Sequence, residues 1–120
     1  MKKLEIIDKE FLDYIKVNSK IHKENLENDL VENTNFQVKV INRMDKVRRE
    51  LAKVYKEYNE VYSEKWKYYT YESERVPETE KEKEFMIKND EDIKPLKEII
   101  DGYELDMKRL NDLNDMIKQL

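Results

Sequence analysis

Apolar residues in the middle of the chain recur at alternating spacings of four and three. The positions are Val40, Met44, Val47, Leu51, Val54, Tyr58 and Val61. This heptad pattern predicts a long amphipathic helix that packs one face against a partner helix. No Gly or Pro interrupts residues 36–74, so a helix over residues 36–73 would be about 55 Å long at 1.5 Å per residue. Thr34 or Asn35 is a suitable N-cap for it.

A second heptad pattern lies near the C-terminus. Its positions are Leu96, Ile100, Tyr103, Met107, Leu110, Asn114 and Ile117. It predicts a helix over residues 93–119, with Pro95 tolerated in the first turn. We expect this helix to fold back on the first as an antiparallel hairpin. The polar Asn114 in an apolar seam is of the kind that fixes helix register or oligomer state.

The segment between the two helices, residues 74–92, is predicted to be an acidic connector. Residues 72–92 hold nine acidic and four basic side chains. Pro77 breaks the first helix, a short helix is expected over residues 78–88, and Phe85, Met86 and Ile87 are its expected anchors to the core. Asn89 and the acidic residues 90–92 are expected to cap the last helix, since acids suit its positive N-terminal end.

The first 35 residues are predicted to form a separate N-terminal arm. Leu4, Ile7, Phe11 and Ile15 would share one face of a helix over residues 3–16. A weaker helix, lined by Ile21, Leu26 and Leu30, would end near residue 33. The fold class is therefore all-α: residues 1–35 as a short helical arm and residues 36–120 as a long antiparallel helical hairpin.

Composition supports a narrow helical protein. Of the 120 residues 43% are charged and 38% hydrophobic, with a single Gly, which is too polar for a wide globular core. No Cys is present, so a reducing, cytoplasmic compartment is expected. No apolar run approaches a membrane span. Apolar surface is left over beside the seams, so we expect a homo-oligomer.

Basic and aromatic side chains gather on the first long helix. Residues 36–71 contain nine bases against five acids, a local charge of about +4. Lysines attract phosphates, and an exposed aromatic ring offers a face on which an unpaired base can stack. The candidate residues for binding single-stranded DNA are Arg49, Lys53, Lys56, Lys65, Trp66, Lys67, Tyr68 and Tyr69.

The alternative interpretation of the same side chains is structural. Aromatics at helical spacing usually belong to a core, and Tyr55, Tyr58 and Tyr62 are assigned to packing on that basis. Trp66, Tyr68, Tyr69 and Tyr71 fall in six consecutive positions and point all round a helix. At least one of these four should therefore be exposed.

The string Lys65-Trp66-Lys67-Tyr68-Tyr69-Thr70, followed after an acidic break by residues 89–93 and a heptad helix, resembles the UvsY family of tailed-phage recombination mediators. Lys65 matches the family's basic position, Trp66 its bulky position and Tyr68-Tyr69-Thr70 its Tyr-Tyr-Thr/Ser core. Tyr71 stands where the family usually has Gly. The chain stops at Leu120, about where family members continue into a tail involved in assembly.

The resemblance implies a non-enzymatic recombination mediator. Such a protein forms a ring of six or seven subunits and binds single-stranded DNA. It helps to load a RecA-like recombinase onto strands covered by single-strand binding protein. If the protein is phage-encoded, its compartment would be the cytoplasm of the host cell.

Catalytic chemistry is not indicated. The single His, His22, lies in a polar stretch, and the chain has no Cys, Gly-rich phosphate loop or His-carboxylate metal spacing. We expect no catalytic residues, no metal site and no cofactor. The serious rival to the mediator hypothesis is a coiled-coil interaction or assembly protein that uses the same seams and binds no nucleic acid.

Overall fold

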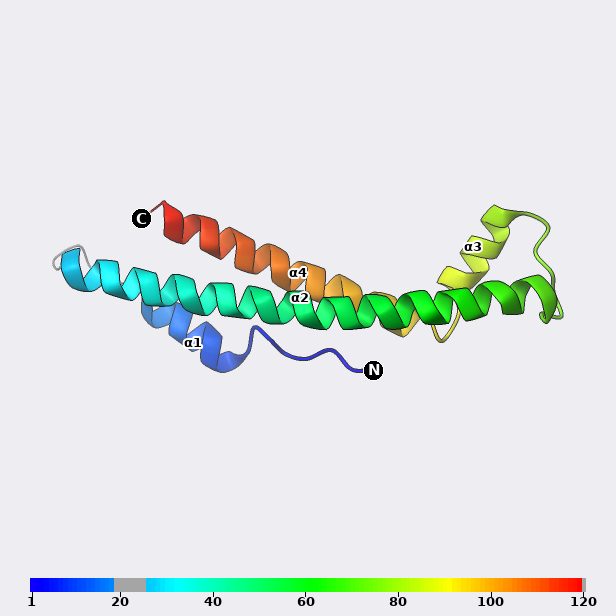
Figure 1. The fold of residues 1–120 in the computed structure, drawn as a ribbon, viewed down its shortest axis with the longest axis horizontal. Coiled ribbons are helices and arrows are strands. Elements are labelled where there is room, and N and C mark those ends of the chain that lie inside the picture. The colour runs from blue at the N-terminus through cyan, green and yellow to red at the C-terminus, as the bar shows by residue number, and fades with distance from the viewer. Residues whose placement is uncertain (19–25, 120) are drawn as a thin grey trace. The chain divides into compact units, whose positions relative to one another are not determined.

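The computed structural model describes residues 1–18 and 26–119, with side chains for residues 1–17 and 34–119. Its helices are α1 (Lys9–Asn18), α2 (Leu26–Tyr71), α3 (Glu80–Lys88) and α4 (Lys94–Lys118), and these ranges hold no strand (Figure 1). The all-α class and the packing of two long helices are confirmed. Ile21 and His22 lie outside the described residues.

The chain divides into two compact units. We call Leu4–Glu50 with Tyr103–Leu120 the arm unit, and Met1–Lys3 with Leu51–Gly102 the connector unit. The arm unit contains α1, the first part of α2 and the second part of α4. The connector unit contains the end of α2, α3 and the beginning of α4.

Two predicted helix boundaries near the N-terminus are wrong. Helix α2 already begins at Leu26 and continues through Thr34 and Asn35, so neither residue is an N-cap, and from Leu26 onward the predicted second helix is the first part of α2. The reason is that Thr and Asn cost a helix interior only a few tenths of a kcal/mol each. The predicted boundary between residues 35 and 36 therefore lies inside a continuous helix.

Helix α1 begins at Lys9 rather than at residue 3 because Asp8 caps it. The Asp8 carboxylate accepts a hydrogen bond of 2.8 Å from the amide of Phe11, and its carbonyl accepts one from Leu12, as expected of an N-cap. The segment before it is non-helical, and the amide of Leu4 donates to the hydroxyl of Tyr103 at 2.8 Å.

The core of the arm unit follows the predicted seams. In this unit α4 runs antiparallel to α2, as Figure 1 shows. The buried apolar side chains come from the N-terminal segment, α1, α2 and α4, namely Ile6, Phe11, Phe36, Val40, Met44, Val47, Tyr103, Leu110 and Ile117. Heptad spacing predicted the α2 and α4 members except Phe36, because burial repeats with the helical period.

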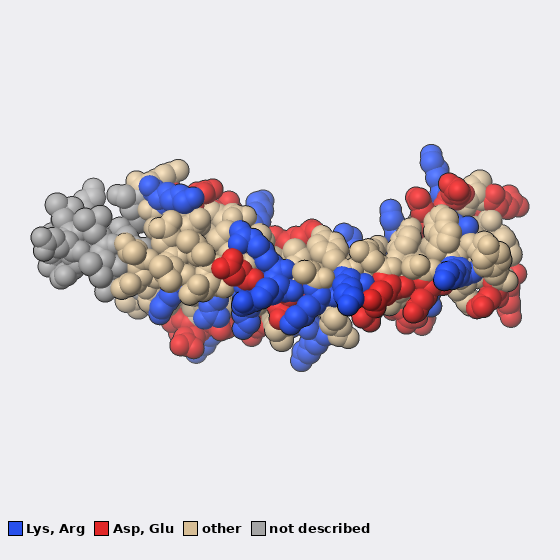
Figure 2. Space-filling model, viewed as in Figure 1, with Lys and Arg blue, Asp and Glu red and all other residues tan. Residues whose placement is uncertain are grey.

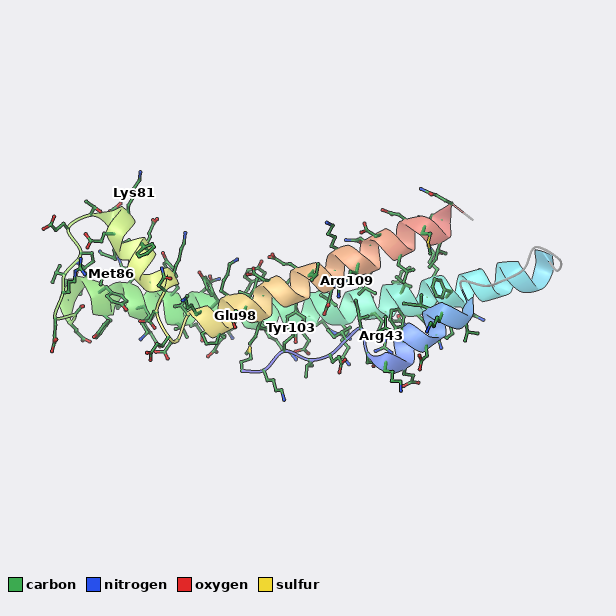
Figure 3. All side chains as sticks on the ribbon, turned by 180° about the vertical axis from the view of Figure 1, so that it is seen from behind. Arg43, Lys81, Met86, Glu98, Tyr103 and Arg109 are labelled. Atoms are coloured by element: carbon green, nitrogen blue, oxygen red, sulfur yellow. The ribbon has the colours of Figure 1, made fainter. Side chains whose placement is uncertain are left out.

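Polar contacts inside the arm unit fix how its helices meet. Asn114 accepts a 3.3 Å hydrogen bond from the side chain of Gln37, so this polar seam residue has a partner within the chain. Arg43, labelled in Figure 3, donates to the carbonyl of Ile6 at 3.1 Å and to the Asp8 carboxylate at 3.3 Å. Its guanidinium also lies 5.0 Å from the ring centre of Phe11. A single arginine therefore ties α2 to the start of α1.

The connector unit has its own core and is organised by α3. Its buried side chains are Val54, Ile87, Ile93, Leu96, Ile99 and Ile100, together with Pro77. Thr79 caps α3 by accepting from the amide of Glu82 at 3.1 Å. The anchor prediction holds for Ile87 but is wrong for Phe85, which is 68% exposed because it points away from the core face of α3.

We predict that Asp8→Ala lowers the free energy of unfolding by about 1 kcal/mol, the usual cost of removing an N-cap. Asp8→Asn keeps a capping oxygen but loses the charge beside Arg43, so it should cost only a few tenths of a kcal/mol, as for other partly exposed ion pairs. Urea unfolding followed by circular dichroism measures both. Equal losses for the two variants would show that the cap does not hold α1.

The same residue predicts an acid dependence. The amide of Phe11, and then Arg43, hold the pKa of Asp8 below its usual value against a smaller opposing effect of burial. A carboxylate whose pKa is lowered in the folded state stabilises the fold at pH values above its unfolded-state pKa, which is near 4. This stabilisation is lost as the pH falls through the folded-state pKa. The stability difference between the wild type and Asp8→Asn should therefore shrink below about pH 4, and a constant difference would contradict it.

Candidate nucleic-acid interface

The predicted binding residues near the end of α2 meet α3 and the turn before α4 within the connector unit. Helix α2 ends at Tyr71, where the amides of Glu72 and Ser73 both bond to the carbonyl of Tyr68. The chain then returns through α3. The turn at residues 89–93 is held by Asp90, whose carboxylate accepts from the amide of Asp92 at 2.9 Å. This carboxylate therefore stabilises the turn that precedes α4, and the first turn of α4 itself contains no acidic residue.

Lys65 lies between two carboxylates of that turn. Its ammonium is 2.8 Å from Asp92 and 3.3 Å from Asp90, and its side chain is 22% exposed. The hydrogen bond to Asp92 raises the pKa of Lys65; burial opposes it and Asp90 adds to it. The lysine is therefore held in its charged form by acids of its own chain.

Tyr69 completes the same cluster. Its hydroxyl donates to the Asp90 carboxylate at 2.6 Å. That hydrogen bond, with burial, raises the pKa of Tyr69 to about 12. Burial alone would raise the pKa of Asp90, but the bonds from Tyr69, the Asp92 amide and Lys65 together lower it. We call Lys65, Tyr69, Asp90 and Asp92 the carboxylate clamp.

Trp66 is covered by α3. The ammonium of Lys83 lies 4.2 Å from the ring centre of Trp66, in the geometry of a cation–π contact. The indole is half-buried. One turn further on, the hydroxyl of Thr70 donates to the carbonyl of Trp66 at 2.6 Å. The tryptophan therefore works here as a contact between α2 and α3.

The remaining predicted residues of the connector unit are exposed. Lys53, Lys56 and Lys67 face solvent, and at 100° per residue they fall within about 60° of one another on α2, opposite the buried seam. Tyr68 is 40% exposed, with its edge packed on Tyr69 at a centroid distance of 5.0 Å. Tyr71 is 82% exposed. We call Lys53, Lys56, Lys67, Tyr68 and Tyr71 the outward cluster.

Arg49, the last predicted residue, is exposed on α2 within the arm unit. Other bases of that stretch are engaged: Arg48 pairs with Asp45 at 2.8 Å, and the ammonium of Lys39 lies 3.8 Å from the ring centre of Tyr14. Some of the excess positive charge in residues 36–71 is therefore already engaged in contacts within the chain.

Acidic side chains reduce the net positive charge around the outward cluster. Glu57, Glu60 and Glu64 are also exposed on α2, and basic and acidic side chains lie next to one another along the part of α2 that approaches α3 (Figure 2). An anion would meet alternating charges here. A polyanion at this face would therefore make only weak contacts that salt screens.

The tyrosines that were assigned to packing differ in how far they are buried. Tyr58 and Tyr62 are half-buried, with ring centres 5.9 Å apart, as the packing interpretation expects. Tyr55, which is also assigned to packing, is more exposed, at 39%. Tyr71, one of the four aromatics of which at least one was expected to be exposed, is the most exposed tyrosine of the outward cluster.

The sequence did not predict the contacts that two connector residues make with α2, although Asp90 was expected in the acidic cap before α4. Lys83 and Asp90 lie in the connector, among many charges of both signs, and nothing in their spacing marks them as partners of Trp66 and Tyr69. Their only sequence signal is that an acidic, short connector must fold back over the basic end of α2.

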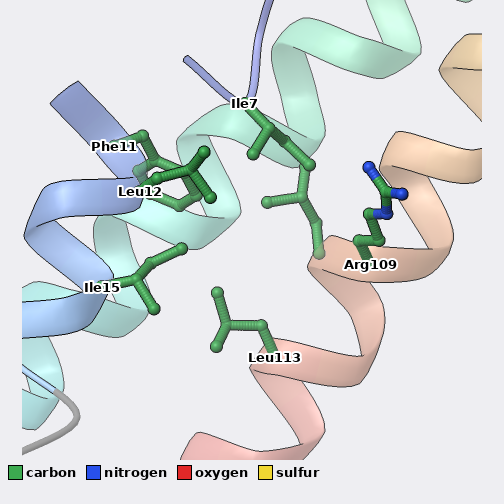
Figure 4. Close-up of a pocket in the computed structure, with 7 residues that line it drawn as sticks. Ile7, Phe11, Leu12, Ile15, Arg109 and Leu113 are labelled. Atoms are coloured by element: carbon green, nitrogen blue, oxygen red, sulfur yellow. The ribbon is translucent and has the colours of Figure 1, made fainter. Parts of the chain in front are cut away.

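The arm unit also contains an apolar cavity of about 350 Å³ between α1 and α4. Its lining, shown in Figure 4, is Ile7, Phe11, Leu12, Ile15, Arg109, Leu110 and Leu113. Arg109 is the one charged side chain in that lining. The cavity is separate from the residues predicted to bind DNA.

Within the described part of the chain no group of three or more His, Cys, Asp or Glu side chains is placed to hold a metal ion. No helix of that part is both long and apolar enough to cross a membrane. Comparison with known proteins finds no matching family model, no matching curated protein and no matching solved structure.

We predict that Tyr69→Phe lowers the free energy of unfolding by about 1 kcal/mol at neutral pH, because Asp90 loses a charge-assisted hydrogen bond. A tyrosine whose pKa is raised in the folded state stabilises the fold at pH values below its unfolded-state pKa, which is near 10. This stabilisation is lost as the pH rises toward the folded-state pKa of about 12. Wild-type stability should therefore fall over this pH range, and Tyr69→Phe should reduce the slope.

Urea unfolding at a series of alkaline pH values measures that slope. The matched control is Tyr71→Phe, which removes a hydroxyl from an exposed ring and should leave the slope unchanged. An identical pH dependence in the wild type and Tyr69→Phe would show that the hydroxyl of Tyr69 is not bound to Asp90 in solution.

Proposed function

We propose that the protein is a non-enzymatic mediator of recombination that binds single-stranded DNA along the exposed face of α2. In this proposal it helps to load a RecA-like recombinase onto strands covered by single-strand binding protein. The proposal joins the mediator-like string at residues 65–70 to the chemistry of the outward cluster.

The observation that carries the proposal is the exposure of bases and aromatics together at the end of α2. Lys67 and Tyr71 are four residues apart on the same face of the helix and both are exposed, and Tyr68 lies beside them. A phosphate can approach Lys67 while a base stacks on a tyrosine, a contact worth about 1–3 kcal/mol per base. This pairing suits an unpaired strand and requires no sequence preference.

Weak binding per chain is sufficient if several chains act together. The outward cluster contains three lysines among three glutamates, so a single copy would hold a strand loosely. A closed ring of six or seven copies would make each further contact effectively intramolecular and raise the overall affinity steeply. The proposal therefore includes a homo-oligomer as the binding form.

A second candidate function is a structural interaction protein that binds no nucleic acid. The cavity beside α1 favours it, since its apolar lining leaves Leu12 52% exposed and could receive a side chain of a partner protein. The same experiment separates the two functions, because only the mediator requires DNA binding.

The experiment is fluorescence anisotropy of a labelled single-stranded oligonucleotide over a salt series. We predict binding at low salt that weakens as salt rises. Lys56→Ala with Lys67→Ala should lower the affinity about tenfold. For single strands the salt slope falls by about 0.7 for each phosphate contact removed, so the double variant should lose about 1.4 from it.

The matched control is Lys81→Ala with Lys88→Ala, which makes the same charge change at exposed positions of α3 in the same unit. It should change affinity much less. No binding by the wild type at low salt overturns the proposed function, and equal losses in the two double variants overturn the assignment to the face of α2.

A further inference from the structure

The carboxylate clamp presents a chemical conflict with DNA binding at the same end of α2. Lys65 is the basic residue of the mediator-like string, yet its ammonium already touches Asp92 at 2.8 Å and Asp90 at 3.3 Å. Two carboxylates around one ammonium leave a net charge of about −1, which repels a phosphate instead of attracting it.

The two carboxylates are not equivalent. Asp90 is 10% exposed and also accepts from Tyr69 and from the backbone of the turn, so removing it would leave several donors without an acceptor. Asp92 is 66% exposed, and its carboxylate contacts Lys65 at the surface. Asp92 can therefore leave Lys65 with fewer contacts broken than Asp90.

Carboxylate and phosphate oxygens accept the same hydrogen bonds from an ammonium. A phosphate that replaced Asp92 would find Lys65 still anchored on one side by Asp90. Tyr68, of the outward cluster, lies three positions after Lys65 on α2, and the ammonium of Lys65 lies 5.5 Å from the ring centre of Tyr68. A strand with a base stacked on Tyr68 would therefore come within reach of Lys65.

We infer that Asp92 is an autoinhibitory residue that occupies Lys65 in place of a DNA phosphate, so that a bound strand must displace Asp92 to use this lysine. The inference rests on the proposed function, since it concerns the regulation of that same site. Partial occupation by Asp92 weakens binding of short or isolated anions and leaves strands that make several other contacts able to compete.

The test is the affinity of Asp92→Asn for a labelled single-stranded oligonucleotide at low salt. Removing the competing carboxylate should raise affinity about twofold to fivefold, the range expected from an exposed ion pair. The matched control is Glu91→Gln, the same charge change at the neighbouring exposed residue, which should raise affinity by less than about 1.5-fold through distant electrostatics alone.

A second arm repeats both changes in a Lys65→Ala background. If Asp92 acts through Lys65, the gain from Asp92→Asn should fall to that of Glu91→Gln, which is the signature of coupling in a double-mutant cycle. Circular dichroism confirms that each variant is folded.

The outcomes distinguish this inference from the proposed function. Absence of binding by the wild type and by all variants overturns the proposed function. Binding that depends on Lys67 but rises equally in Asp92→Asn and Glu91→Gln, or rises equally with and without Lys65, overturns the inference and leaves the proposed function standing.

Discussion

The hydrogen bonds around Asp90 are the interaction on which the connector unit depends. One carboxylate receives the hydroxyl of Tyr69 at 2.6 Å, the ammonium of Lys65 at 3.3 Å and a backbone amide of its own turn at 2.9 Å. Charge-assisted bonds of this kind are stronger than neutral ones when they are partly buried. They fix the turn before α4 against the end of α2, and Ile87 and Ile93, on either side of Asp90 in the chain, are fully buried. The basic-aromatic string is thus divided by geometry, with Lys65 and Tyr69 turned toward the chain's own acids and Lys67 and Tyr71 toward solvent.

In the arm unit, too, polar contacts between distant residues determine how the helices pack. A narrow two-helix seam buries little apolar surface, so polar contacts must decide the register. Asn114 and Gln37 pair across the seam, and Arg43 joins α2 to the residues around Asp8. A polar seam residue therefore does not by itself require a second chain, because its partner can lie in the same molecule.

The sequence predicted the features that repeat with the helical period and missed those that depend on contacts between distant residues. Val40, Val47, Val54, Ile100 and Leu110 were placed in the core by their spacing, and all are buried. The starts of α1 and α2 were missed because Leu4 and Ile7 match a helical pattern in a segment that is not helical, and because Thr34 and Asn35 are good caps that a long helix can also absorb. The partners of Lys65 could not be predicted, since the connector contains many acids and nothing in the sequence shows which of them contacts this lysine. Tyr71 is exposed because it is the last residue of α2. The sequence did not locate this helix end, because no Gly marks it.

The central claim is that the outward cluster, and not the aromatic-basic string as a whole, forms the DNA-binding face. The most direct measurement is an NMR titration of the isotope-labelled protein with a short single-stranded oligonucleotide at low salt. The account predicts the largest amide shifts at Lys56, Lys67 and Tyr71, with a smaller change at the half-buried indole of Trp66. Shifts confined to the arm unit, or no shifts at saturating oligonucleotide, would contradict it.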